Sequence, residues 1–441
     1  MTVDLNTTFG IGWDEKFHQT VAFRPDPGIE NKAVVLYPQE TFQTMEGFGG
    51  AVTDAAGYVY SLMDEKQKRE LLETYFSPER MNYTVVRVPL DSCDFSLSQY
   101  EAMSGPDDDF SMARTEKYIL PMLEDIRDCM GRAPALMLSP WSPPAFMKTN
   151  GKRENGGSLK PECRAMWAEY LCRYIKEFQD RGFSVQRISL QNEPHAVQTW
   201  DSCVCTAAEQ KEFLRDFMAP ALASHGLENM EIFLWDHNKE RVYEWMRDAI
   251  DETTDPLVAG AAFHWYSGDH FQALDMVQRR FPGKKLIASE SCFEFYKYGN
   301  LAPSAAGQKL AHELMGDLNH GMSAFYDWNL LLDEKGGPNY VENYCLAPFL
   351  YDTQAKKLIP QLLAQYMEHF SHYIVPGSVR IGASSYDSAV EVTAWRRPDG
   401  TLAVVLLNRD ESIAPVCLRL DGQAAEFMLY PQSITTCVIQ D

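Results

Sequence analysis

Two glutamates stand where apolar, extended segments end, and two carboxyl groups placed in this way could cleave a glycosidic bond. The first is Glu193, in Ser-Leu-Gln-Asn-Glu-Pro at residues 189–194. Pro194 has no N–H to donate to a sheet ladder, so we expect the strand to end here with Glu193 at its carboxyl end. Taken alone, Glu193 could equally be a catalytic residue or an ordinary loop glutamate that precedes a proline.

The second glutamate is Glu290, which closes the apolar segment at residues 284–290, three strands after the first. In retaining glycoside cleavage one carboxylate attacks the anomeric carbon and the other carboxyl group protonates the leaving oxygen, with the two groups about 5–5.5 Å apart. We therefore expect Glu193 to be the acid/base and Glu290 the nucleophile. Glu290 by itself could be a glutamate without a catalytic role near the start of a helix. The occurrence of both glutamates at strand ends favours a catalytic pair.

Polar side chains in neighbouring strands could support these glutamates. Tyr266, in Phe-His-Trp-Tyr at residues 263–266, could orient the nucleophile, and His264 could bond a sugar hydroxyl or the surroundings of the nucleophile. The alternative for His264 is an ordinary core histidine. Arg87 is a charge inside an apolar strand, and buried arginine is rare unless paired. Glu290 is its obvious partner, although a purely structural salt bridge explains Arg87 equally well.

No metal or organic cofactor is expected. The chain has no His-Glu-x-x-His motif and no group of His, Cys and carboxylate residues at zinc-site spacing. The run Gly-Phe-Gly-Gly-Ala at residues 47–51 lacks the third glycine of a dinucleotide-binding loop.

The elements that position these residues alternate between strand and helix. Apolar runs that end in polar or aromatic clusters recur at residues 47–54, 84–94, 133–141, 185–193, 231–238, 258–266, 284–290 and 323–329. Segments with helical spacing of apolar residues lie between them, among them residues 64–75, 115–130, 161–181, 207–224 and 305–318. Eight strand-then-helix units predict a (β/α)₈ TIM barrel, whose active site lies at the carboxyl ends of the strands.

The two ends of the chain have a different pattern. Short Val-, Leu- and Ile-rich runs at residues 388–395, 401–407, 414–420 and 434–439 are separated by turn signals, and residues 33–38 also resemble a strand. We expect an α/β protein with an attached β-sandwich built from both termini. The expected divisions are N-terminal sandwich strands at residues 1–40, the catalytic barrel at 41–372 and the C-terminal sandwich at 373–441.

Charge and hydropathy exclude several classes of partner. The formal net charge is −22 over 441 residues, without a run of Lys and Arg long enough to form a basic patch, so nucleic acid is not expected. No apolar stretch approaches the roughly 20 residues of a membrane span. The N-terminus lacks the basic and apolar regions of a signal peptide, so we expect a cytoplasmic protein whose ten cysteines are reduced.

The motifs together resemble glycoside hydrolase family 30, which includes the glucosylceramidases. Its members are retaining glycosidases with a (β/α)₈ barrel and a β-sandwich. The similarity extends from about residue 40 to 350. The matching segments are residues 46–56, 87–95, 138–151, 191–194, 264–266, 288–292 and 328–339.

The resemblance implies a role for each residue of the site. It makes Glu193 the acid/base and Glu290 the nucleophile. It places further residues around the sugar or the nucleophile: Asp94, Trp141, Asn192, Trp328, Arg87, His264, Tyr266 and, at the pocket rim, Asn343. Asp94 and Trp141 would hold the outer hydroxyls of a glucose-type ring. Two features depart from the family pattern, namely Asp91, where a small residue is expected, and the loop at residues 195–206.

The function we predict is exo-acting hydrolysis of terminal β-linked glucose, from a small-molecule or oligosaccharide β-glycoside, with net retention. A β-xylosidase, a dual β-glucosidase/β-xylosidase and an endo-β-1,6-glucanase are the alternatives within the class. A non-catalytic carbohydrate-binding protein is the alternative outside it, and the presence of both glutamates argues against that interpretation.

Overall fold

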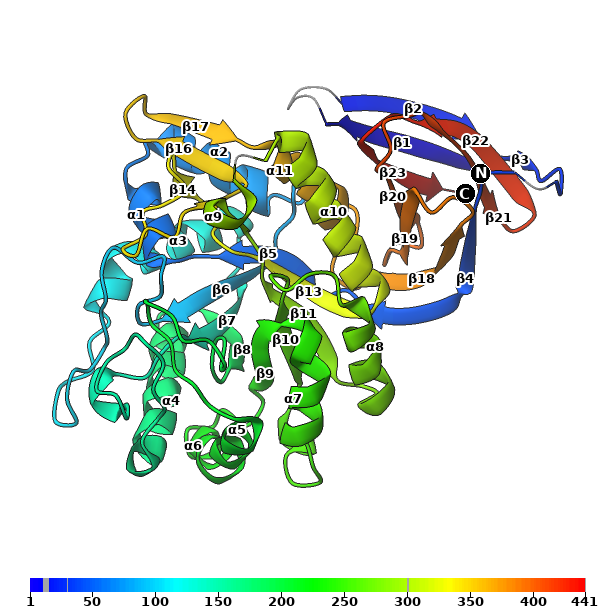
Figure 1. The fold of residues 1–441 in the computed structure, drawn as a ribbon. Coiled ribbons are helices and arrows are strands. Elements are labelled where there is room, and N and C mark those ends of the chain that lie inside the picture. Colours follow the sequence, from blue (N-terminus) through cyan, green and yellow to red (C-terminus); the bar gives the residue numbers. More distant parts are fainter. Residues whose placement is uncertain (11–15, 30, 300, 441) are drawn as a thin grey trace.

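Eight parallel strands close into a barrel at the centre of the protein. The computed structural model describes residues 1–10, 16–29, 31–299 and 301–440 (Figure 1). Around the barrel, the strands lie in chain order, and the last pairs with the first. They are β5 (Gly47–Ala51), β6 (Val85–Leu90), β7 (Ala135–Pro140), β8 (Ser184–Ser189), β9 (Glu231–Asn238), β10 (Gly260–His264), β11 (Lys285–Glu290) and β13 (Met322–Asp327). The predicted barrel is confirmed.

Glycines in the first barrel strand allow a close approach between strands. A Cβ atom on Gly49 would lie 1.8 Å from the carbonyl oxygen of Val85 on β6. No side chain fits in that space, so the glycine-rich run at residues 47–51 serves strand packing in the barrel.

Helices surround the barrel and cover its apolar outer face. In α4, Trp167, Leu171, Ile175 and Phe178 recur at three- to four-residue spacing and are all buried. The helices are α1 (Asp54–Ser61), α2 (Glu65–Phe76), α3 (Ala113–Met130), α4 (Arg164–Asp180), α5 (Ala207–Phe213), α6 (Ala219–Ser224), α7 (Val242–Ala249), α8 (Phe271–Arg280), α9 (Phe295–Tyr298), α10 (Pro303–Asn319) and α11 (Leu362–Ser371). The single helix predicted at residues 207–224 contains a π-helical segment, Leu214–Met218, between α5 and α6. None of the helices in the described ranges has the length and apolarity that a membrane span requires.

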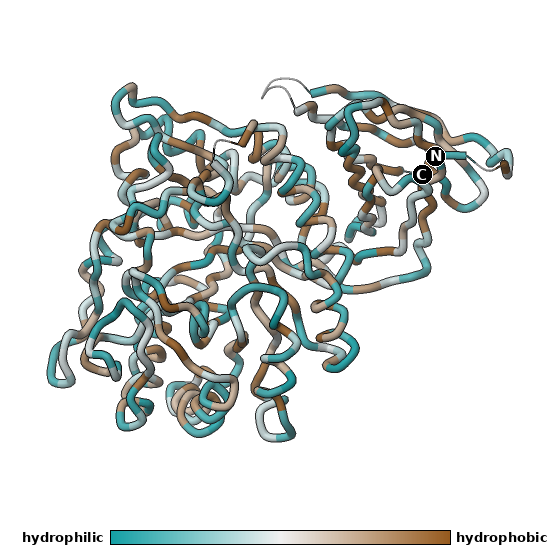
Figure 2. The backbone as a smooth tube through the Cα atoms, viewed as in Figure 1, coloured by the Kyte–Doolittle hydropathy of each residue, from teal (hydrophilic) through white to brown (hydrophobic). Residues whose placement is uncertain are grey.

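Both ends of the chain build the second domain, a ten-stranded sheet with its own apolar core (Figures 1 and 2). The order is β2-β1-β23-β20-β19-β18-β4-β21-β22-β3, and β2 also contacts β22, so the sheet folds over onto itself. The strands are β1 (Thr2–Phe9), β2 (Lys16–Ala22), β3 (Arg24–Pro25), β4 (Ala33–Thr44), β18 (Val379–Ser385), β19 (Val390–Arg396), β20 (Leu402–Asn408), β21 (Ala414–Leu420), β22 (Gln423–Leu429) and β23 (Ser433–Gln440). The predicted sandwich with contributions from both termini is confirmed.

Three details of this sheet differ from the sequence-based expectation. β18 and β22 did not stand out in the sequence, because β18 is rich in Gly and Ser and β22 in Ala, and these residues have weak strand preference. The strand expected at residues 33–38 extends to Thr44. The domain division near residue 40 therefore falls inside β4 and stays a prediction.

Short strands in the loops border the mouth of the barrel. β12 (Phe293–Glu294) pairs with β15 (Cys345–Leu346), and β14 (Leu332–Asp333) with β16 (Phe349–Asp352) and β17 (Lys357–Pro360). The β12–β15 pair connects the segment after β11 with the long segment after β13, and the β14–β16–β17 sheet lies within that long segment.

The N-terminal strand should be essential to the stability of the sandwich. Val3 is fully buried between Val21 and Ile439, whereas its neighbour Thr2 is exposed. Val3→Asp places a carboxylate in this core and should lower the free energy of unfolding by about 3 kcal/mol or more. Thr2→Asp is the matched control and should melt at the wild-type temperature in a calorimetric scan. Equal melting temperatures for the two variants would contradict this role of β1.

Candidate active site

A pocket at the carboxyl ends of the barrel strands brings together most of the residues singled out from the sequence. Eight of those ten residues line it. They are Asp94, Trp141, Asn192, Glu193, Tyr266, Glu290, Trp328 and Asn343. Arg87 and His264 lie directly beneath, each without exposed surface.

Arg87 occupies the floor of the site and uses every N–H of its guanidinium. Its Nη1 donates to Glu290 Oε2 at 2.6 Å and to the Ser289 carbonyl at 3.1 Å. Its Nη2 donates to Asn192 Oδ1 and Asp236 Oδ2, both at 2.9 Å. Nε donates to Ser139 Oγ at 3.1 Å. All five donors are satisfied, as a buried guanidinium requires, and the predicted ion pair with Glu290 is present.

Glu290 is held at both carboxyl oxygens. Arg87 contacts Oε2, and the hydroxyl of Tyr266 donates to Oε1 at 3.0 Å. Burial raises the pKa of Glu290 above its usual value, because it outweighs the opposing positive charges of His264 and Arg87. The two hydrogen bonds orient the carboxylate and stabilise its ionised form, which is the form that a nucleophile needs.

Glu193 lies beyond the end of β8 with its backbone in the left-handed region, at φ 46°. Its N–H donates to the carbonyl of Asp236 at 2.9 Å, which holds this unfavourable conformation. Oε1 lies 3.2 Å from His264 Nδ1 and 3.6 Å from His237 Nδ1. Burial raises the pKa of Glu193, but the hydrogen bond from His264 and the charges of both histidines outweigh it, so the pKa is lowered.

His264 connects the two glutamates. Its Nδ1 lies 3.2 Å from Glu193 Oε1 and 4.0 Å from Glu290 Oε1. Burial lowers its pKa, but Glu290, Asp236 and Glu193 together raise the pKa of His264 to about 9. His264 therefore holds a proton 3.2 Å from Glu193, the residue that would act as general acid. The expectation that His264 bonds a sugar hydroxyl does not fit this placement, because its side chain is fully buried.

Asp236 was missed in the sequence and is central to the site. It accepts hydrogen bonds from Arg87, from His264 Nε2 at 3.1 Å and from the hydroxyls of Ser189 and Ser289. Burial raises the pKa of Asp236, but Arg87 and His264 outweigh burial and lower it. Its only signal in the sequence was its place in Leu-Trp-Asp-His-Asn, at the end of the fifth barrel strand.

The far wall of the pocket is aromatic and acidic. The rings of Trp141 and Trp328 stack with centroids 5.1 Å apart and an interplanar angle of 18°. Asp94 is buried and accepts a hydrogen bond from Asn343 Nδ2 at 3.4 Å. Burial and the negative charge of Glu290 raise the pKa of Asp94 well above its usual value. The backbone N–H of Phe95 is a second partner of Asp94, and the carboxyl group lines the pocket, where it can bond a polar ligand.

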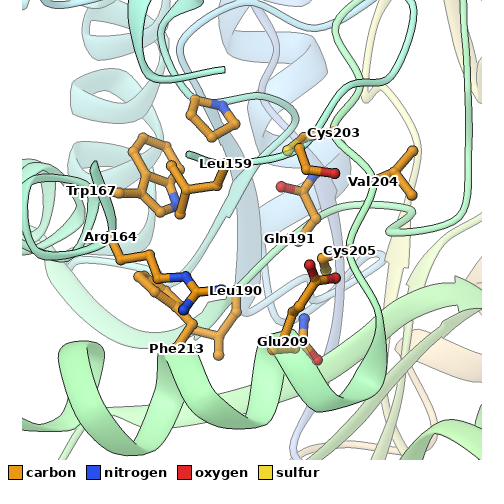
Figure 3. A pocket seen from close by; sticks show the side chains of 13 residues that line it. Leu159, Arg164, Trp167, Leu190, Gln191, Cys203, Val204, Cys205, Glu209 and Phe213 are labelled. Carbon is orange, nitrogen blue, oxygen red and sulfur yellow. The ribbon is translucent and has the colours of Figure 1, made fainter. Parts of the chain in front are cut away.

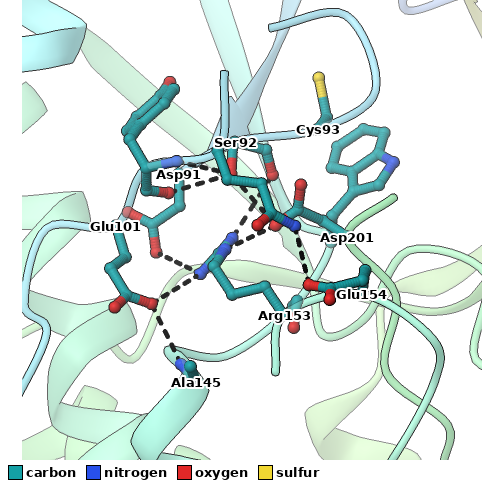
Figure 4. A network of polar contacts seen from close by, with 12 residues as sticks. Asp91, Ser92, Cys93, Glu101, Ala145, Arg153, Glu154 and Asp201 are labelled. Atoms are coloured by element: carbon teal, nitrogen blue, oxygen red, sulfur yellow. Dashed lines mark hydrogen bonds and ion pairs between the residues drawn. The ribbon is translucent and has the colours of Figure 1, made fainter. Parts of the chain in front are cut away.

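Asp91 anchors the loops that surround the pocket. It accepts hydrogen bonds from Tyr170 at 2.6 Å and Tyr174 at 2.5 Å, and Arg153 lies 3.4 Å away. Arg153 also pairs with Glu101 and, at 2.5 Å, with Asp201 (Figure 4). The network joins the loops after β6, β7 and β8, and it explains why an acidic residue stands at position 91.

One group in the described ranges has the geometry to hold a metal ion, although the sequence predicted no metal. Ligand atoms of Glu193, His237 and His264 lie within 4.8 Å of one another. This group includes the candidate acid/base, so a metal bound there would remove the carboxyl group from proton transfer.

A second cavity, of only about 50 Å³, is shown in Figure 3. Its lining is mostly apolar and comes from α4, α5 and residues 203–205. Gln191 stands in the wall between cavity and pocket, where its amide donates to the carbonyls of Trp141 and Asn192 at 2.8 Å. Neither Glu193 nor Glu290 lines this cavity.

The charge on His264 predicts a pH dependence of stability. Because its pKa rises from 6.5 to about 9 on folding, protonated His264 contributes stability that is fully present below pH 6.5. This contribution is lost as the pH rises through about 9. The difference in unfolding free energy between wild type and His264→Gln should therefore be largest in acid and shrink in alkali. His18→Gln, at an exposed histidine, is the control, and a gap independent of pH would contradict the assignment.

Comparison with known proteins agrees with this geometry. The chain is 30% identical to lysosomal acid glucosylceramidase of Mus musculus over 87% of its own length and 79% of the relative's. Among solved structures, it is similar to SrfJ from Salmonella typhimurium, with TM-score 0.97, 35% identity and full coverage of both chains. It is also similar to the endo-β1,6-glucanase BT3312, with TM-score 0.88, 25% identity, and 99% and 98% of the two chains covered.

Two family descriptions cover nearly the whole chain. The glycosyl hydrolase family 30 TIM-barrel domain matches residues 45–374, and the family 30 β-sandwich domain matches residues 377–437. Fold, site and relatives agree, and the chain is a glycosidase that belongs to glycosyl hydrolase family 30.

Proposed function

We propose that this glycosidase is an exo-acting β-glucosidase that works with retention of configuration. The observation that carries the proposal is the pair Glu193 and Glu290, which face one pocket from opposite ends of the β8–β11 arc and share the neighbour His264. The similarity to a glucosylceramidase supports a β-glucoside as substrate.

The contacts of each glutamate suit a different role. Glu290, ion-paired with Arg87 and oriented by Tyr266, attacks the anomeric carbon and forms the glycosyl–enzyme ester. Glu193 gives its proton to the departing oxygen, and His264 lies 3.2 Å away as the partner in that proton exchange. In the second step Glu193 takes a proton from water, whose oxygen attacks the anomeric carbon and releases Glu290.

The far wall suits a terminal glucose. Asp94 and Asn343 supply a carboxyl group and an amide for hydroxyls at the outer end of the ring, and Trp141 and Trp328 provide apolar surface. A buried carboxyl group left without a partner is costly, so a sugar whose hydroxyls miss Asp94 should be a poor substrate.

A bridge across the barrel mouth supports exo action. The hydroxyl of Tyr340, in the loop after β13, donates to Asp201 Oδ2 at 2.9 Å, in the loop after β8. These two strands lie opposite each other in the barrel. Asp201 also accepts from Ser92 Oγ at 3.1 Å, two residues before Asp94, so the bridge stands on the Asp94 side of the pocket. In this proposal the bridge obstructs the path that a polysaccharide would need beyond the terminal sugar.

Cleavage within a β-1,6-glucan is the second candidate function. The similarity to the structure of an endo-β1,6-glucanase favours it, because that chain and this one overlap over nearly their full lengths. The two candidates share the catalytic pair and differ in whether the Asp94 side of the pocket is closed.

Substitution of the two glutamates tests the mechanism. Glu290→Gln should lower kcat by more than about 10⁴-fold, because an amide cannot form the ester intermediate. Glu193→Ala should still form that intermediate from substrates with good leaving groups, and azide should then release a β-glycosyl azide. Glu228→Gln, at an exposed glutamate just before β9 at the opposite end of the barrel, is the control. An α-configured azide product would contradict retention, and full activity in Glu290→Gln would remove its role.

A substrate panel tests specificity. Aryl β-glucoside should exceed aryl β-xyloside in kcat/KM and exceed aryl β-galactoside by at least about 10-fold, since galactose inverts the 4-hydroxyl. Asp94→Ala should narrow the gap between glucoside and galactoside. Linear β-1,6-glucan should release only glucose, and glucosylceramide in mixed micelles tests a lipid aglycone.

The variant Tyr340→Phe, assayed on the same substrate panel, helps to distinguish exo action from endo action. It removes only the hydroxyl that spans the mouth, so it should raise activity on the polymer relative to the aryl glucoside. Oligosaccharides as first products of the wild-type enzyme would favour the endo-glucanase, and a preference for xyloside would favour a β-xylosidase.

A further inference from the structure

We propose that Cys292 and Cys345 form a reversible disulfide beside the active site, and that this oxidation inactivates the enzyme. Both residues are free thiols in the structure, and their sulfur atoms lie 3.2 Å apart. A disulfide needs about 2.05 Å, so a movement of roughly 1 Å is enough to bring the sulfurs to bonding distance.

The backbone already holds the two cysteines side by side. Cys345 lies in β15, which pairs antiparallel with β12, and Cys292 immediately precedes β12. The N–H of Phe295 donates to the Tyr344 carbonyl at 3.0 Å, which extends the pairing. The cross-link would thus join two neighbouring segments without a large change in the fold.

An oxidant can reach both thiols through the substrate pocket. Cys292 and Cys345 are buried, with 5% and 0% of their surface exposed, but both line the pocket that holds the two glutamates. Hydrogen peroxide is small enough to enter a pocket built for a sugar. Burial raises the pKa of both thiols, so the reaction should be slow at neutral pH and faster as the pH rises.

The oxidation transfers two electrons from sulfur to peroxide. The Cys345 sulfur, which accepts the S–H of Cys292, loses its proton and attacks one peroxide oxygen, giving a sulfenic acid and one water. The Cys292 sulfur then loses its proton and attacks the sulfenic sulfur, which releases a second water and forms the S–S bond. A dithiol such as dithiothreitol reverses the reaction by thiol–disulfide exchange.

The cross-link would displace residues on two sides of the site, near Glu290 and near Asp94. Cys292 follows Glu290 by two residues, and its sulfur lies 3.5 Å from the Tyr266 hydroxyl that donates to Glu290. Cys345 follows Asn343, the partner of Asp94, by two residues. Since a displacement of about 1 Å near a catalytic group can lower the rate about 100-fold, kcat/KM should fall by about 10- to 100-fold.

Peroxide treatment followed by two independent measurements tests the proposal. Digestion without reductant should yield a peptide that joins Cys292 to Cys345 and lacks two hydrogen atoms, as measured by mass spectrometry. Hydrolysis of an aryl β-glucoside should fall with the same time course, and dithiothreitol should restore it. The peptide is detected without any assumption about substrate or mechanism, so it distinguishes a failure here from a failure of the proposed function.

Single substitutions supply the controls, each compared as the ratio of its treated to its untreated activity. Cys345→Ala should keep a ratio near one, because the cross-link cannot form. Cys129→Ala, at the exposed cysteine near the end of α3, should lose activity as the wild type does. Absence of the joined peptide, or a joined peptide without loss of activity, would overturn the proposal. Equal loss in Cys345→Ala would do the same.

Discussion

The buried charge of Arg87 is the constraint on which the rest of the active site depends. A guanidinium without exposed surface is tolerated only if its five donors are satisfied and its charge is neutralised. Its acceptors come from β7, β9 and β11 and from Asn192 just beyond β8, while Arg87 itself lies on β6. One side chain therefore fixes the relative positions of five barrel strands and, with them, the orientation of Glu290, the proposed nucleophile.

A second buried arginine, Arg153, fixes the relative positions of the loops, as Arg87 fixes those of the strands. Arg153 joins Asp91 and Asp201, and Asp201 in turn meets Tyr340 from the opposite side of the barrel. Both arginines lie in surroundings where loss of one carboxylate partner would leave a charge unpaired, at a cost of several kcal/mol. Buried ion pairs thus hold both the floor of the pocket and the Asp201–Tyr340 bridge between its loops.

The sequence predicted the parts of this site that have a local signature. Glu193 before Pro194, Glu290 at the end of an apolar run and Arg87 within one are each visible in a few residues of context. Asp236 and Asp201 were missed because their partners are remote in sequence: Asp236 contacts Arg87 across 149 positions and Asp201 contacts Tyr340 across 139. His264 was recognised, but its contact with Glu193 depends on the barrel bringing strands β8 and β10 to one centre. Periodicity places strands around a barrel, but it does not identify which side chains meet inside it.

The different roles proposed for the two glutamates correspond to the kind of cation beside each. Glu290 is paired with an arginine, which does not release its proton at any physiological pH, so the positive charge that favours the carboxylate form of Glu290 is permanent. Glu193 is paired with a histidine, whose charge is itself a transferable proton. Arg87 and protonated His264 carry two positive charges against the three carboxylates of Asp236, Glu193 and Glu290. The cluster therefore has a net negative charge of one unit. Moving the proton from His264 to Glu193 would leave this net charge unchanged and give Glu193 the proton that a general acid needs. The proposed difference in chemical task between two identical side chains therefore has a physical origin, because the neighbour of Glu290 holds a permanent charge and the neighbour of Glu193 holds a mobile one.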